Sequence, residues 1–579
     1  MPTTFNGQVL IQPQVRAAFN TTALTPLVTP SPSPHTLVLI GPSPEGPNSL
    51  VTVTSPATVT AALGPSTVDL PASQVNQLAD AALLALNPSP DTTGAAPLQV
   101  WNVNPTTTAS ATLADASAVA QISGSTTRWG TPANNIKWSV ATGSTSGYSL
   151  TIADDQSGDS YTANNLALTP GTIAYTGTEL TDVTITVTDT SATVSAGATP
   201  SAVFSVSFTT AATVAQFANQ VNQQADFVFT VSDPNPNDPT EALFDNVTGV
   251  AVTSAATALT ANVTAVVRWI NSGAQPLVTA TRAANATSLA TPGTFAYFAG
   301  GTTGTAANSD WQDAYTALQA QSDVLWVVPI SPSSTIWAMN QAHCALMHSL
   351  GHGRSGAVGG SANTAVADAV SAAASLASRY TQYIWQGWQQ ATATGATITY
   401  PPNVVAAAHA AMHAGQPLDQ STTFVRVNAI GLDQTAAPPV IDQLVQAGVV
   451  VVRPQQGGFV VVKDQTTAAV NPTATADAVQ AQAVNETFAI EALIQQALQV
   501  FVGKPITTTT AARVQSTLAT LFQTLATPPH PLIFTAPSLA NIGVAIDGTV
   551  ISVQAPVSPT LVADFVTVLL SASVDTASA

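Results

Sequence analysis

Two hydrophobic patterns alternate along the 579-residue chain. Short continuous apolar runs, such as "TLVLIG" (36–41) and "VLWVVPI" (324–330), predict strands that are buried on both faces. Between such runs, segments such as "PASQVNQLADAALLALN" (71–87) carry apolar residues at helical spacing. Buried strands that alternate with helices predict an α/β core, which we place at residues 35–101 and 299–500.

The later part of this core repeats the alternation. The segment "TIWAMNQAHCALMHSL" (335–350) predicts an amphipathic helix, and "IDQLVQAGVVVVRP" (441–454) predicts a helix followed by one strand. The segment "VNETFAIEALIQQALQVFVG" (484–503) predicts a long helix at the end of the core.

Residues 102–298 follow the second pattern. Runs such as "LTDVTITVTDTSATVS" (180–195) and "SAVFSVSFTT" (201–210) alternate apolar residues with Thr or Ser. This period of two is typical of antiparallel strands that expose one face to water. Turn-forming clusters such as "DPNPNDP" (233–239) separate the runs. The sequence therefore predicts a β-rich insertion that interrupts the α/β core.

The two ends of the chain predict elements that cannot bury themselves. Residues 1–34 join a strand-like run to four closely spaced prolines, which predicts an extended N-terminal arm. Residues 501–579 predict a C-terminal module with a helix at 507–526, a hairpin at 544–557 and a terminal strand within 560–574. Terminal strands without a local partner are suited to pairing with a neighbouring chain.

Composition narrows the classes of function. Charged residues make up 7% of the chain, where about 25% is usual, and 30 acidic residues face 12 basic ones. Scattered bases and a net charge of −18 argue against nucleic-acid binding. A weakly charged surface is expected if other subunits cover it, or if the protein is an extracellular β-rich protein with a hydroxyl-rich coat.

The sequence shows neither a targeting segment nor a pair of cysteines. We find no secretory signal at the N-terminus and no apolar stretch of 18 residues, so we expect neither export through such a signal nor a membrane span. The single cysteine, Cys344, excludes an intrachain disulfide and reads as a small buried hydrophobic residue.

One motif suggests a nucleotide site. The stretch "GHGRSG" (351–356) matches G-x-G-x-x-G letter for letter. In a dinucleotide site this motif follows a strand and opens a helix, whose N-terminus then binds the pyrophosphate. Here a helical pattern precedes the motif and an apolar strand-like run follows it. We therefore interpret Gly351 as the residue that ends a helix, and we expect no nucleotide.

Two groups of histidines have spacings that could bind a metal. His343, His348 and His352 lie within ten residues, but only His348 and His352 share a helical face and the glutamate of H-E-x-x-H is missing. His409 and His413 have the spacing of one helical turn, yet the sequence suggests no third ligand. We expect ordinary helix and loop histidines, and no metal.

Three further segments are weak candidates. The segment "FVGKPIT" (501–507) lacks the upstream glycine of a phosphate-binding loop. The acidic turns at 154–159 and 233–238 could bind calcium weakly, but we expect both to be solvated turns. No arrangement of residues resembles an activated nucleophile, so we expect no enzymatic activity and no cofactor.

The order of the segments resembles the tail sheath protein of contractile-tailed bacteriophages. The resemblance runs from residue 35 to about 525 and is interrupted by the insertion. Its parts are the opening "LVLIGPSPEGPNSLVTVTSPATVTAALG", then "VVRWINSGAQPLVTATR" with "YFAGGTTGTAANSDWQDAYTAL", then "VVAAAHAAMHAG", and finally "IDQLVQAGVVVV" leading through "GGFVVVKDQTT" to "NETFAIEALIQQALQVFVGKPITTTTAARVQSTLATLF". The double glycine Gly300–Gly301, followed by a Trp-containing helix, is the most specific of these matches.

This resemblance implies a structural protein. Sheath subunits polymerise as stacked rings, commonly six-fold, around an inner tail tube, and contraction drives the tube through the host envelope during genome ejection. The implied partners are other copies of the chain, the tail tube protein, and the baseplate and tail terminator proteins, and the implied location is the virion. A related contractile system, such as an R-type bacteriocin or an extracellular injection system, is the alternative; a surface-layer or adhesin protein is less favoured.

The resemblance also implies positions within such an assembly. The insertion at 102–298 is expected to face outward, away from the tube, because it interrupts the α/β core and its Ser/Thr alternation fits a solvated sheet face. The C-terminal module faces the tube in the family, and its bases Lys504 and Arg513 lie close together around the start of the predicted helix. We expect these two residues to contact acidic groups of the tube, although two ordinary surface charges would look the same in the sequence.

Overall fold

The structure, a computed structural model, describes residues 3–5, 8–10, 36–70, 74–232, 235–291, 295–392 and 395–563. It divides into two compact units. The core unit is formed by residues 1–43, 47–105 and 305–579, and the second unit by residues 44–46 and 106–304. The sequence placed the insertion at 102–298, and it gave no sign that the loop 44–46 belongs with it.

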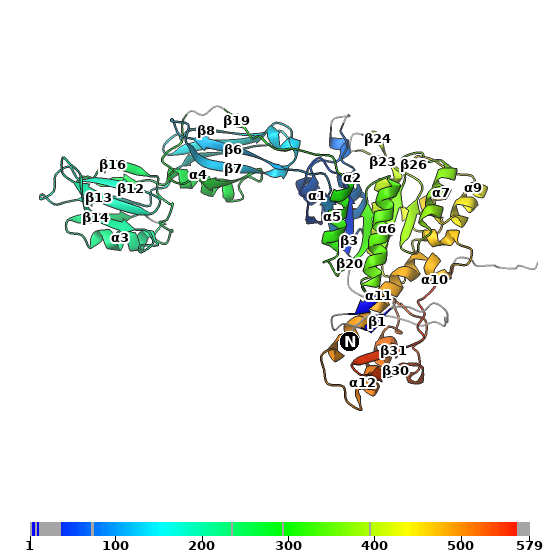
Figure 1. Ribbon diagram of the computed structural model, residues 1–579. Helices are drawn as coiled ribbons and strands as arrows, with labels where there is room; N and C mark the ends of the chain where they lie inside the picture. The colour runs from blue at the N-terminus through cyan, green and yellow to red at the C-terminus, as the bar shows by residue number, and fades with distance from the viewer. Residues whose placement is uncertain are drawn as a thin grey trace, which may run out of the picture. The chain divides into compact units, whose positions relative to one another are not determined.

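A seven-stranded sheet organises the core unit (Figure 1). All neighbouring strands are parallel except the edge pair β4–β5, which is antiparallel. Parallel strands need crossover connections, and the chain supplies helices between them. The strands, in spatial order, are β27 (Val449–Val450), β22 (Thr381–Ile384), β21 (Ser355–Gly359), β20 (Val324–Pro329), β3 (Thr36–Gly41), β5 (Leu98–Asn102) and β4 (Leu50–Val53).

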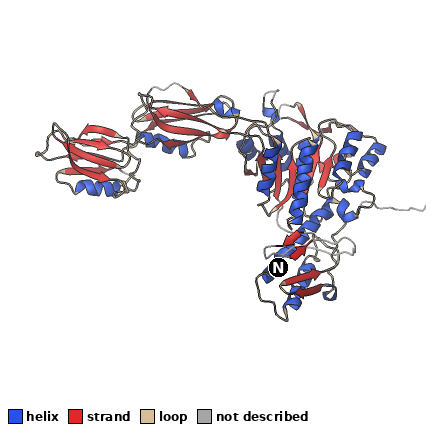
Figure 2. Ribbon diagram, viewed as in Figure 1, coloured by secondary structure: helices blue, strands red, loops and turns tan. Residues whose placement is uncertain are grey.

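Helices cover both faces of this sheet, as Figure 2 shows. Leu37 and Leu39 of β3 pack with helices α2 (Gln77–Leu86) and α8 (Pro402–Ala414), whereas Val38 and Ile40 pack on the opposite face with α5 (Asn308–Leu318) and α6 (Ser334–Ser349). Farther along that face, α7 (Val366–Leu376) and α9 (Pro438–Gln446) cover β22 and β27. Because alternate residues of β3 meet different helices, all six of its residues are buried. The mixed α/β core that the sequence predicted is confirmed.

Smaller elements complete the core unit. Helix α1 (Pro56–Leu63) packs against α2, and α11 (Ala481–Leu498) leads into the C-terminal module. That module contains α12 (Thr510–Thr524) and an antiparallel hairpin of β30 (Gly543–Asp547) and β31 (Val550–Gln554), as predicted. Two three-stranded sheets also belong to this unit: β24 (Thr397–Tyr400), β23 (Trp388–Ala391) and β26 (Gly431–Leu432); and β25 (Arg426–Val427), β29 (Gly458–Val461) and β28 (Val452–Gln455).

The second unit is built from antiparallel sheets with two separate cores. One core includes Trp138 and Phe298, packs against α4 (Asn262–Asn271), and lies between the sheets β10-β9-β8-β19 and β18-β7-β6. The strands of these sheets are β10 (Ser160–Leu166), β9 (Tyr148–Asp154), β8 (Ile136–Thr142), β19 (Ala296–Tyr297), β18 (Val278–Arg282), β7 (Ala120–Trp129) and β6 (Thr108–Ala114).

The other core of the second unit includes Phe217 and Phe229 and is bounded by α3 (Val214–Asn222). Its sheets are β14-β13-β12-β16 and β15-β11-β17. Their strands are β14 (Ser201–Ser207), β13 (Ser191–Ala196), β12 (Thr184–Val187), β16 (Val247–Ala251), β15 (Phe227–Val231), β11 (Gly171–Tyr175) and β17 (Thr257–Leu259). The Ser/Thr alternation therefore predicted antiparallel strands correctly.

The terminal arms fall largely outside the described residues. Within the N-terminal arm, β1 (Thr3–Phe5) and β2 (Gln8–Leu10) form an antiparallel hairpin. Residues 11–35 and the predicted terminal strand beyond residue 563 lie outside the described part of the chain. None of the helices in the described ranges is at once long enough and apolar enough to cross a lipid bilayer.

Candidate functional site

The G-x-G-x-x-G motif ends a helix, as its context predicted. Helix α6 stops at Ser349, Leu350 is its C-cap, and Gly351 follows with φ 86°. A side chain is strained at this φ, so glycine is favoured there. Strand β21 then begins at Ser355, after the motif rather than before it. The helix N-terminus that a pyrophosphate needs is therefore missing at this loop.

The arginine of the motif is a structural residue. Arg354 is fully buried, and its guanidinium donates to the carbonyl oxygens of Leu318 (2.9 Å) and Gln321 just beyond the end of α5. Its Nη1 lies 2.7 Å from Nε2 of His343. Burial, with the nearby Arg354 charge, lowers the pKa of His343 to about 3, so His343 is the neutral acceptor of this contact. The side chains tie α5, α6 and β21 together.

The three histidines of the first group do not converge on a site. His343 faces Arg354, whereas His348 contacts the Tyr380 hydroxyl (2.8 Å) and Glu491 (3.1 Å). His352 follows the end of α6. Cys344 is buried as predicted, and burial raises the pKa of its thiol to about 12, which leaves it protonated and unreactive.

A third side chain with metal-binding chemistry, which the sequence did not suggest, lies beside the second pair of histidines. His409 and His413 lie on the fully buried helix α8, and Asp464, from the loop after β29, places Oδ1 3.1 Å from Nε2 of His413. One ligand atom from each of the three residues lies within 4.8 Å of the others. Burial lowers the pKa of His409 to about 3; burial alone would raise that of Asp464, but the neighbouring His413 lowers it to about 2. The only hint in the sequence was an aspartate just after an apolar strand.

Carboxylates of the acidic turns form ion pairs within the second unit. Asp154 is buried and pairs with Arg128, which also binds Glu45 of the loop 44–46. Asp155 pairs with Lys137 at 2.6 Å. At 233–238, residues 233 and 234 lie outside the described part of the chain, and Asp238 pairs with Arg268 at 2.9 Å. Bases of the second unit thus pair with Asp154, Asp155 and Asp238 of these turns.

The C-terminal module presents the two bases that the sequence singled out. Lys504 is exposed in the loop before α12, and Arg513 is exposed on the first turns of that helix. The Arg513 guanidinium carbon lies 5.7 Å from the ring centre of Phe501, within the range of a cation–π contact. Both charged groups are therefore accessible on one part of this module.

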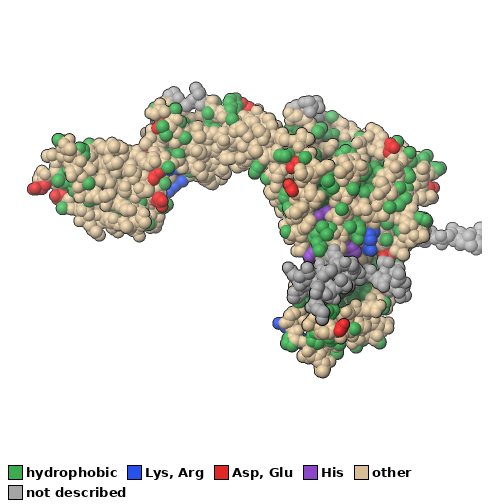
Figure 3. All heavy atoms as spheres, in the orientation of Figure 1, with side chains coloured by type: hydrophobic (Ala, Val, Ile, Leu, Met, Phe, Trp, Pro, Cys, Tyr) green, Lys and Arg blue, Asp and Glu red, His purple; other side chains and the backbone are tan. Residues whose placement is uncertain are grey.

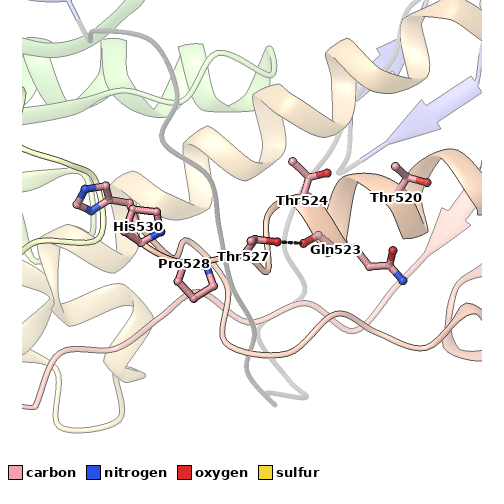
Figure 4. A pocket seen from close by; sticks show the side chains of 7 residues that line it. Thr520, Gln523, Thr524, Thr527, Pro528 and His530 are labelled. Carbon is pink, nitrogen blue, oxygen red and sulfur yellow. Dashed lines mark hydrogen bonds between the residues drawn. The ribbon is translucent and has the colours of Figure 1, made fainter.

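An open hollow of about 620 Å³ lies at the C-terminal end of the same helix (Figure 4). Thr520, Gln523 and Thr524 line it from α12, and Pro528 and His530 line it from the following turn. Among the described residues that line it, His530 is the one ionisable side chain, and it contacts Asp419 at 3.2 Å. Threonine, glutamine and proline offer no activated group, so the hollow has the character of a contact surface rather than of a catalytic pocket.

The last described residues are fixed to the start of α11. The side-chain amide of Gln480 bonds both to the carbonyl oxygen of Val562 (2.9 Å) and to its N–H (3.1 Å), as a neighbouring strand would. Thr560 donates to the buried carboxyl of Glu486 through its hydroxyl. Burial holds the pKa of Glu486 well above its usual range. These contacts fix Thr560 and Val562 against the first turns of α11.

The visible surface carries few charged side chains (Figure 3). This follows from a composition with 7% charged residues, several of which are consumed by the internal ion pairs. Hydroxyl and apolar groups supply most of what a partner would contact.

Comparisons with known proteins identify the fold. No protein-family model matches the sequence, and no curated protein matches it. The structure is similar to a sheath tail protein from Desulfitobacterium hafniense, with a TM-score of 0.52, 14% identity, and coverage of 94% of this chain and 96% of that one. It is also similar to a sheath tail protein from Listeria innocua, with a TM-score of 0.51, 14% identity, and coverage of 92% and 93%. The resemblance noted in the sequence is thus confirmed for the fold, and the chain has the fold of the sheath tail proteins.

Proposed function

We propose that this chain is the structural subunit of a contractile tail sheath. The observation that carries the proposal is the fold shared with two sheath tail proteins over more than nine-tenths of the chain. In this role the protein acts mechanically and needs neither a catalytic centre nor a cofactor. The buried thiol of Cys344 and the buried Arg354 of the glycine-rich motif agree with a structural role.

A sheath must be a polymer of one chain with itself. Head-to-tail contacts that do not close on themselves generate a helical cylinder, and we expect stacked six-fold rings. A surface with few charges suits this, because a subunit that touches many copies of itself buries much of that surface.

Contraction would be driven by contacts between subunits. In the proposal the extended sheath is held by a kinetic barrier, the baseplate releases the first ring, and subunits rotate as near-rigid bodies into a state with larger mutual contacts. The buried surface gained supplies the free energy, so no nucleotide is consumed. The shortening sheath would drive the tube through the host envelope.

The terminal arms would keep the subunits linked during this motion. Strand addition to a neighbour is a natural use for strand-like ends, and the Gln480–Val562 contacts give the C-terminal arm a fixed root. Chains lacking residues 1–25, or lacking 564–579 but keeping Val562, should be soluble subunits that do not polymerise. Normal cylinders from both truncations would exclude this role.

In this proposal, different parts of the chain face the tube and the outside of the sheath. We propose that the C-terminal module faces the tube and that exposed Lys504 and Arg513 contact its acidic groups, while the second unit faces outward. The tail terminator would cap the far end of the cylinder. Capsid and terminase genes beside this one would indicate a phage tail and location in the virion; their absence would favour a bacteriocin or an extracellular injection system.

Negative-stain electron microscopy of the purified full-length chain tests the proposal. We expect hollow cylinders with a constant diameter, formed by the chain alone or on addition of its tube protein. Particles that remain single subunits at high concentration and with tube present would contradict it.

A further inference from the structure

We infer that His409, His413 and Asp464 form a binding site for one divalent cation of the zinc class in the core unit. The three side chains come from two elements far apart in the sequence, helix α8 and the loop after β29, and one ligand atom from each lies within 4.8 Å of the others. Sheath assembly as proposed above does not require this site, so the two proposals stand or fall separately.

The three ligand atoms lie within 4.8 Å of one another, and one pair approaches the spacing found around a bound ion. Ligand atoms bound to tetrahedral zinc at 2.0–2.2 Å lie roughly 3.3–3.6 Å from one another. Nε2 of His413 and Oδ1 of Asp464 are 3.1 Å apart, close to that range. Two imidazole nitrogens with one carboxylate oxygen is a donor set that zinc accepts, and it leaves a fourth position for water.

A hydrogen bond between His413 and Asp464 would not explain the position of His409. Its side chain is 1% exposed, and among the described residues its Nε2 has no hydrogen-bond partner. A buried imidazole nitrogen without a partner is unfavourable, whereas a metal ligand would be satisfied. Helical spacing places this ring beside His413, with 5.5 Å between the ring centres.

The surrounding residues hold the ligands as an outer shell would. Gln382 donates to Asp464 Oδ1 at 2.8 Å, and the Ser421 hydroxyl donates to Oδ2 at 3.1 Å. The His413 ring is stacked on Trp326, with 4.9 Å between ring centres. Such outer contacts fix ligand orientation in metal sites. The Gln382 Oε1 is buried without a hydrogen-bond partner among the described residues.

Burial determines how the ion must enter. All three ligands are buried, and they come together only when residues 402–414 and 464 are packed. We therefore expect the ion to bind during folding and to be retained afterwards. The ion would join α8 to the loop after β29 and stabilise the core unit.

Metal analysis of the full-length chain, purified without a polyhistidine tag, tests the inference. Elemental analysis after dialysis should find one zinc per chain. After unfolding in denaturant with chelator, refolding with Co²⁺ should give the visible absorption of a four- or five-coordinate site, and Zn²⁺ should displace it. A metal content well below one per chain, together with refolding that is unaffected by zinc and gives no cobalt bands, would overturn the inference.

Variants locate the ion. His409→Gln should abolish the cobalt bands, and Gln382→Ala should weaken binding about 10–100-fold, as outer-shell changes do. His343→Gln is the matched control, because His343 is also a buried helical histidine but bonds to Arg354; it should retain the metal. A folded His409→Gln chain with an unchanged cobalt spectrum would overturn the inference. If that variant does not fold, the reconstitution of the unaltered chain decides alone.

Discussion

The core unit buries its main sheet on both faces, whereas the second unit buries its sheets on one face. In the core unit, strands β3 and β20 are buried at all six of their positions, because helices cover both faces of the sheet. In the second unit, β12 and β15 alternate buried with more exposed residues, so each sheet packs through one face only. The Thr residues of these strands thus lie on the sheet faces that contact water.

This difference indicates how independent each unit is. The core sheet is assembled from residues on both sides of the second unit, since β5 ends at Asn102 and β20 begins at Val324. The second unit is formed by one continuous stretch plus the loop 44–46, and it has its own two cores. We expect the core unit to be indispensable for assembly and the second unit to be dispensable.

The largest expected effect comes from removing a buried tryptophan in each unit. Trp326→Ala, in the central strand β20, should cost about 3–5 kcal/mol and prevent assembly. Trp138→Ala is the matched change in the second unit, where Trp138 is also fully buried. Its cost should be similar but confined to the second unit. Calorimetry should show a lowered second-unit transition and an unchanged core transition; a single cooperative transition lowered by both variants would remove the distinction between the units.

Deleting the second unit also tests whether the core unit folds independently, and it does so without creating a cavity in the core. A chain in which a short Gly/Ser linker replaces residues 106–304 should fold, because the core strands and their covering helices are all retained. Circular dichroism and electron microscopy should find a helix-rich protein that still polymerises. Insoluble or unfolded chains would mean that the core sheet depends on the second unit.

A smaller effect is expected from the ion pairs of the second unit. Arg128→Ala removes the guanidinium that pairs with the nearly buried carboxylates of Glu45 and Asp154. Breaking a buried pair in this way costs about 3 kcal/mol. Only the second-unit transition should shift in calorimetry. The matched control is Arg268→Ala, whose ion pair is half-exposed and should contribute about 0–1 kcal/mol.

Glu486 gives the core unit a pH dependence. Its pKa in the folded chain lies well above its unfolded value, chiefly because the carboxyl is buried. A raised pKa contributes stability that is complete below the unfolded pKa and is lost as pH rises through the folded pKa. Glu486→Gln should therefore raise the core melting temperature above pH 7, by the equivalent of about 1 kcal/mol, with no gain near pH 4. An equal gain at both pH values would show that ionisation is not the cause.

The smallest effect on stability is expected at the proposed tube contact. Lys504→Glu with Arg513→Glu should change folding stability by less than about 0.5 kcal/mol, since both side chains are exposed. The double variant should co-assemble poorly with the tube at low salt, while still forming sheath-only polymers. Arg268→Glu in the second unit is the control and should leave co-assembly intact. Parent-like binding of the double variant to tubes at low salt would remove these residues from the contact.

Local patterns predicted the elements well. The run "TLVLIG" is strand β3 to the residue, the helical pattern before Gly351 is α6, and the late hairpin lies where expected. The hydrophobic periodicity and the positions of glycines determine these elements, and both are local features of the sequence. One strand was wrong: Val449 and Val450 belong to β27 of the main sheet, Val452 begins β28 of a small sheet, and Val451 lies between the two strands. Their apolar character is uniform, so the sequence could not show the division.

Long-range contacts could not be predicted. Asp464 is 51 residues from His413, and Glu45 is 83 residues from Arg128, so neither contact leaves a spacing signal. The same holds for Gln480, which bonds to Val562 across 82 residues. Such polar residues acquire their partners only when the sheet and its covering helices have formed.

Helical reconstruction of the assembled protein by cryo-electron microscopy tests the account most directly. The account predicts a hollow cylinder whose continuous wall is the core unit, with the C-terminal module on the inner surface and residues 106–304 on the outside. A cylinder with the second unit lining its channel would contradict the proposed arrangement, and the lack of any helical polymer, with or without tube, would contradict the proposed function.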